Sequence, residues 1–188
     1  MTIPWVIVTA PWIIIGVLAL VLIFIYNRLI ILRNYVKNAW SGIDNQLQRR
    51  YDLIPNLVET VKGYMAHEKD VLESVTKART AFLNAGSVKD TAQAENMMTG
   101  ALKTLFAVSE NYPDLKSSQN FLMLQEELAG TENKISFARQ RYNNAVMNYN
   151  TAIQKFPANI FAGIFNFTAS EFFEVENEEA RKAVKVNF

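Results

Sequence analysis

The chain has 188 residues, with 19 Lys and Arg against 18 Asp and Glu, no Cys and a single His. Proteins that bind nucleic acid carry basic faces, and this chain has almost no excess of positive charge, so no nucleic-acid partner is expected. The lack of Cys excludes disulfides, thiolate catalysis and cysteine metal sites. A histidine metal site or a Ser-His triad would have to be built around His67 alone.

The N-terminal segment is apolar, and every charged side chain lies from Arg28 onward. We expect residues 12–32 to form a transmembrane helix, because about 20 apolar residues cross the hydrocarbon core, and residues 1–11 to form a short external tail. A cleaved signal peptide would need a basic segment before the apolar run and a small-residue cleavage site after it, and the sequence has neither. The positive-inside rule places the C-terminal domain in the cytoplasm, because these cations follow the span: Arg28, Arg33, Lys37, Arg49 and Arg50.

After the span, apolar residues recur at steps of three and four, which predicts an amphipathic helix. No Gly or Pro separates this stripe from the span, so the transmembrane helix is expected to run directly into the first soluble helix. Pro55 predicts a kink within it. The stripe continues through Phe82 to residues 84–87, where Asn and Gly are natural helix terminators.

Two more helices are expected. The second begins near Asp90, which we predict as its cap, and stops at the turn signature of residues 111–114. The third runs from about Ser117, with its buried face reaching Phe156, until Pro157 ends or kinks it. No segment shows sustained period-two alternation. We therefore predict an all-α fold in which the transmembrane helix continues into an antiparallel bundle of three to four long helices, residues 33–157, followed by an amphipathic segment and tail, residues 158–188.

Polar residues interrupt two of the apolar stripes. Arg50 lies between apolar positions of the first helix, and Glu132 does so in the third. A buried Arg requires a carboxylate partner, so we expect Arg49 or Arg50 to pair with Glu127 or Glu132 in a structural polar network. The alternative is that these charges lie at the edge of the bundle, because apolar stripes often contain such interruptions.

Aromatic residues after Pro157 form a candidate interaction surface: Phe161, Phe165, Phe172 and Phe173. Their favoured role is packing against the protein or a neighbouring subunit, because exposed aromatic patches usually mark contacts. The alternative is an amphipathic anchor in the membrane interface. The scarcity of Lys and Arg between residues 158 and 177 weakens that alternative.

Several blocks of the sequence resemble the LemA family. They include DNQLQRRYDLIPNLV at 44–58, ENYPDLK at 110–116 and LQEELAGTENKI at 124–135, with shorter matches at 62–64, 67–68, 78–79, 142–143, 149–150 and 156–157. Lys134 stands where Arg is more usual, and the match loosens after Pro157. The resemblance implies a bacterial inner-membrane protein with an external N-terminus and a cytoplasmic helical bundle, similar to magnetosome membrane proteins and often found beside HtpX-type membrane proteases. It supplies no catalytic residue.

No residue pattern in the sequence indicates an active site. His67-Glu68 begins an H-E-x-x-H pattern, but Val71 replaces the second His, so a helix-surface His is the favoured interpretation. We therefore predict no catalytic residue and no cofactor. The predicted function is a non-enzymatic membrane scaffold that forms a homo-oligomer and contacts membrane lipid. The alternative is an adaptor or regulator of a membrane protease, such as an HtpX-type enzyme, or of a signalling protein. An enzyme with a pocket of Arg, Tyr, Asn and Glu side chains is the third hypothesis.

Overall fold

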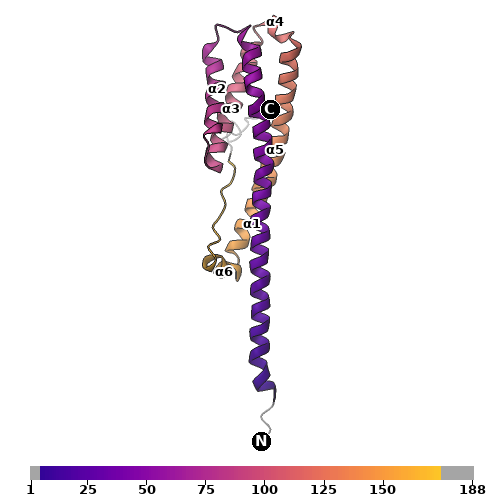
Figure 1. Cartoon of the computed structure of the whole chain (residues 1–188), viewed down its shortest axis with the longest axis vertical. Helices are drawn as coiled ribbons and strands as arrows, with labels where there is room; N and C mark the ends of the chain where they lie inside the picture. Colours follow the sequence, from indigo (N-terminus) through magenta and orange to yellow (C-terminus); the bar gives the residue numbers. More distant parts are fainter. Residues whose placement is uncertain (1–4, 175–188) are drawn as a thin grey trace, which may run out of the picture.

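The computed structural model describes residues 5–174, with side chains from residue 11 onward, and over this range the chain is all-α (Figure 1). Helix α1, Trp5–Lys62, has 58 residues, which corresponds to a length of about 87 Å at 1.5 Å per residue. Its N-terminal part extends alone beyond every other element (Figure 1), and it is long and apolar enough to cross a membrane. The prediction of an all-α fold, in which a long apolar N-terminal helix continues into a helical bundle, is confirmed. Of the predicted tail 1–11, residues from Trp5 already belong to α1, and residues 1–4 lie outside the described part.

Helix α1 ends at Lys62, although the apolar stripe predicted a continuous helix to about Asn84. The amides of Tyr64 and Met65 both bond to the Val61 carbonyl at 2.9 Å, and the chain reverses into α2, Lys69–Leu83. The prediction was wrong because apolar spacing marks a buried face without distinguishing one long helix from two antiparallel ones. Gly63 was the available signal, since Gly commonly follows a helix end. Pro55, in contrast, lies inside α1.

Helix α3, Val88–Ser109, begins two residues before the predicted start. Its cap is Ser87, whose Oγ accepts a hydrogen bond from the Asp90 amide at 3.0 Å. Asp90 therefore lies in the first turn, where a carboxylate is favoured by the helix dipole, and the prediction of Asp90 as the cap was wrong. Ser87 and Asp90 have the spacing of a capping box.

A short helix, α4 (Pro113–Lys116), leads from α3 into the long helix α5, Gln119–Gln154. Pro113 suits the first position of α4, where its missing N–H has no helical partner. Tyr112, just before it, donates a hydrogen bond to Glu68 Oε1 at 3.0 Å, which ties the α1–α2 turn to the start of α4. Because α5 ends at Gln154, the predicted core residue Phe156 lies outside the helix and is exposed.

Helices α1, α2, α3 and α5 form an up-down-up-down bundle at the end of α1 that is remote from the apolar span (Figure 1). One continuous core runs through it, with fully buried side chains contributed by all four helices. Helix α5, with 36 residues, is about 54 Å long, whereas α3, with 22, is about 33 Å. The hairpin of α2 and α3 therefore covers only the distal part of the α1/α5 pair.

The remaining length of α1 and α5 is covered by the chain after α5. Helix α6, Ala158–Ile164, lies beside α1 near the apolar span (Figure 1). Asn166 has a positive φ of 54°, and the Phe167 amide bonds to the Ala162 carbonyl at 2.9 Å; together these form a Schellman-type helix end. Residues 166–174, which we call the strap, then run back toward the hairpin. The predicted segment 158–188 is described only to residue 174, and residues 175–188 lie outside the described part.

Candidate functional site

A buried ion-pair cluster joins three helices around Arg50 of α1. The Arg50 guanidinium donates hydrogen bonds to Glu95 of α3 and to Glu132 of α5, and its Nε donates to Thr131 Oγ1 at 3.4 Å. Arg50 is 2% exposed, and Glu95 is equally buried. The planar fork of Arg can satisfy several acceptors at once, so this single side chain connects α1, α3 and α5.

The structure places the four residues of the expected polar network in two different environments. Arg50 and Glu132 meet at the buried cluster, whereas Arg49 donates to Glu127 Oε2 at 2.7 Å with both side chains about half exposed. The surface pair contributes little to stability, because solvent screens its attraction. Glu95 was missed, although it lies on α3 between the buried residues Ala94 and Met98, where a carboxylate signals a buried partner.

Burial controls the protonation of this cluster. Desolvation raises the pKa of Glu95 to about 7, since the attraction of Arg50 offsets only part of it and the nearby Glu132 carboxylate opposes ionisation. Burial likewise raises the pKa of Tyr51, and the adjacent Glu95 adds to the rise. The phenol of Tyr51 faces Glu95 Oε2 at 3.5 Å, and its ring stacks on Phe82 of α2 at 3.9 Å. The cluster therefore contains a carboxyl group that titrates near neutral pH.

A second polar arrangement holds the strap against α5. Asn150 accepts from the Ser170 amide and donates to the Ser170 carbonyl, both at 2.9 Å. Asn143 makes the same pair of bonds to Phe173, at 2.9 and 3.1 Å. Seven helical residues rise about 10 Å, and three extended residues span about the same distance, so the spacing of Asn143 and Asn150 along α5 matches the spacing of Phe173 and Ser170 along the strap.

The candidate aromatic surface is divided by the fold. Phe173 is 1% exposed and packs beside Trp40 in the core, so it cannot form part of an exposed surface. Phe165 and Phe172 remain substantially exposed and Phe161 is half-buried. The Phe165 ring contacts Tyr26 of α1 with centroids 5.0 Å apart, which places it at the end of the apolar span.

The α1/α5 pair has a second groove that neither the hairpin nor the strap fills; we call it the open groove. Its walls include Gly42 and Arg49 from α1 and Met123, Lys134 and Phe137 from α5, around hollows of about 340 and 430 Å³. Helix periodicity puts these α5 residues on the other side of its buried face from Asn143 and Asn150. Phe137 is 73% exposed and Met123 is 62% exposed, which leaves apolar surface available to a partner.

Metal-binding side chains do not cluster among the described residues. No group of three or more His, Asp or Glu side chains in residues 5–174 is placed to hold a metal ion. His67 is exposed in the α1–α2 turn, and its neighbour Glu68 is engaged by Tyr112.

Comparisons with known proteins agree on one family. The model of the LemA family matches residues 39–188, so the match extends past Pro157, where the sequence resemblance was expected to loosen. The chain is 28% identical to Protein LemA of Metamycoplasma hominis over 180 residues, covering 89% of this chain and 80% of the relative. It is 26% identical to the magnetosome protein MamQ 2 of Paramagnetospirillum magneticum and 24% identical to MamQ of Magnetospirillum gryphiswaldense. Each of these matches covers 79% of this chain but only 64% of the MamQ relative. The family match covers most of the chain, and the protein belongs to the LemA family.

Proposed function

We propose that this protein is a non-enzymatic membrane scaffold whose bundles self-associate through the open groove. The observation that carries the proposal is the exposed apolar surface at Phe137 and Met123, which lies on one side of the α1/α5 pair. An anchor in α1 would hold copies in one plane with their grooves at the same height. Charges of both signs line the groove, including Lys134 and Glu127, and such a mixed rim permits contacts between identical copies.

The test is the mass of the full-length protein in nanodiscs, measured by light scattering corrected for lipid and scaffold protein. We expect a discrete multiple of 21.4 kDa. Phe137→Ser should shift the mass toward one chain, because it removes the most exposed ring of the groove. Leu83→Ser is the matched control, since Leu83 is 55% exposed on α2, away from the groove. A wild-type monomer would contradict self-association and favour an adaptor for a membrane protease or signalling protein, to be tested by partner capture from membranes.

We also propose that the bundle is cytoplasmic and the N-terminus external, at the bacterial inner membrane. The support is the set of cations that follow the span, beginning with Arg28 and Arg33, because cytoplasmic flanks are enriched in Lys and Arg. The chain has no Cys, so a single Cys introduced at Ser117, an exposed position, reports topology without background labelling. Labelling of Ser117→Cys in intact cells by a membrane-impermeant maleimide would contradict this orientation; labelling only after lysis supports it.

A further inference from the structure

A hollow of about 530 Å³, separate from the open groove but on the same side of α5, is formed by α1, the end of α5 and the start of α6. Two cations line it, Arg28 of α1 and Lys155, which directly follows the last residue of α5. Thr151 and Asn148 add a hydroxyl and an amide to the same wall. No carboxylate of the described residues forms an ion pair with Arg28 or Lys155.

The apolar side of this hollow faces the span. Phe24 and Ile25 lie one helical turn before Arg28, which places them about 5–6 Å closer to the membrane interior. Leu29 and Leu32 also line the hollow, on the bundle side of Arg28. On the span side of the two cations the lining residues are apolar, which is where the acyl chain lies when a phospholipid phosphate is bound between the cations.

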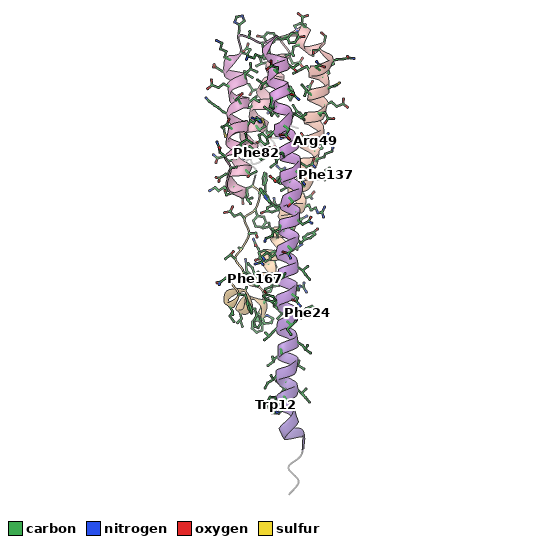
Figure 2. All side chains as sticks on the ribbon, in the orientation of Figure 1. Trp12, Phe24, Arg49, Phe82, Phe137 and Phe167 are labelled. Carbon is green, nitrogen blue, oxygen red and sulfur yellow. The ribbon has the colours of Figure 1, made fainter. Side chains whose placement is uncertain are left out.

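Helix α6 lies at the same level along α1 as the hollow. Ala158, its first residue, lines the hollow, and Phe165, just after the helix, contacts Tyr26. Ile160 and Ile164 of α6 are 51% and 64% exposed, and Figure 2 shows the labelled Phe167 close to Phe24 along the axis of α1. An apolar helix at this level suits the boundary between headgroups and acyl chains, where Tyr26 is also favoured.

We propose that this hollow, the Arg28–Lys155 site, binds an anionic phospholipid of the leaflet that faces the bundle. Arg28 and Lys155 contact the phosphate, Thr151 and Asn148 donate hydrogen bonds to its oxygens, and an acyl chain lies along Phe24 and Ile25. Two cations from distant parts of the chain distinguish the site from a single side chain that reaches up to the headgroups. The assignment rests on the membrane span of α1 and is independent of self-association.

The test is native mass spectrometry of the full-length protein released from nanodiscs of phosphatidylcholine mixed with phosphatidylglycerol. Wild type is expected to retain phosphatidylglycerol over phosphatidylcholine. The double variant Arg28→Gln/Lys155→Gln should lower that retention roughly tenfold or more, since each cation near a membrane surface adds about 1 kcal/mol of attraction to anionic lipid. The matched control is Lys62→Gln/Lys89→Gln, which removes the same charge from exposed positions outside the site.

Equal retention of the two lipids by wild type, or equal loss in the test and control variants, would overturn the proposal. Carbonate extraction of the Arg28→Gln/Lys155→Gln variant verifies that it is still inserted. Light scattering separates the two proposals. The variant is expected to keep the wild-type mass while losing the lipid, whereas Phe137→Ser changes the mass and retains the lipid.

Discussion

The two ends of the α1/α5 pair are covered in different ways. At the distal end, α2 and α3 complete a four-helix bundle, and the buried Arg50 cluster joins α1, α3 and α5. At the proximal end, where the hairpin no longer reaches, an extended strap lies along α5 and is held by Asn143 and Asn150. A helix satisfies its own backbone, but an extended segment has to find partners elsewhere. The proximal end therefore needs amide side chains where the distal end uses packing and ion pairs.

The largest expected loss of stability comes from a substitution in the buried cluster at the distal end. Arg50→Met leaves Glu95 and Thr131 without their buried donor, and losing one partner of a buried pair costs about 3–5 kcal/mol of unfolding free energy. Denaturant unfolding of the full-length protein in nanodiscs, followed by circular dichroism, measures the change. Arg49→Met is the matched control, and its half-exposed pair with Glu127 predicts a loss of about 1 kcal/mol or less. Similar losses in both variants would contradict the distinction between the buried and surface pairs.

The second effect concerns pH. Because the pKa of Glu95 is raised to about 7 in the folded protein, the folded state binds this proton more tightly than the unfolded state does. The resulting stabilisation is fully present below the ordinary pKa of a Glu side chain, which applies to the unfolded state. It is lost as pH rises through about 7. Unfolding free energy should therefore fall between about pH 5 and pH 8, by at most about 3 kcal/mol from this group.

Glu95→Gln should flatten this dependence, because the amide does not titrate. Thermal unfolding at several pH values measures it, and Glu127→Gln is the control at an exposed carboxylate of α5. An unchanged slope in Glu95→Gln would show that Glu95 does not hold a proton near neutral pH.

The third effect breaks the proximal end without unfolding the bundle. Asn143→Ala and Asn150→Ala each remove two hydrogen bonds to the strap, worth about 1–3 kcal/mol in total at roughly 0.5–1.5 kcal/mol per bond. Hydrogen exchange at the Ser170 and Phe173 amides should accelerate accordingly. Amides of α2 and α3 should be unaffected. Asn144→Ala, at an exposed neighbouring position, is the control; an equal acceleration there would contradict the assigned role of the two Asn pairs.

The sequence by itself determined the features that depend on each residue and its near neighbours. A charge-free run specified the apolar span, spacing at three and four specified the helices, and the position of Arg50 within a stripe indicated a buried partner. The sequence shows Asn143 and Asn150 as polar residues beside Tyr positions of α5, but it does not indicate that they bind the strap. Periodicity reports which face of a helix is buried and contains no information about what covers it.

Only the tertiary structure decided which elements meet. It showed that α1 ends at Lys62, that Glu95 of α3 faces Arg50, and that Phe173 returns to the core beside Trp40. These outcomes depend on helix lengths and on pairings between residues far apart in the chain. The hairpin is shorter than α5, and the strap covers the difference. The physical reason is that the apolar faces of α1 and α5 can be buried by any segment that reaches them, provided that the backbone N–H and C=O groups of that segment find hydrogen-bond partners.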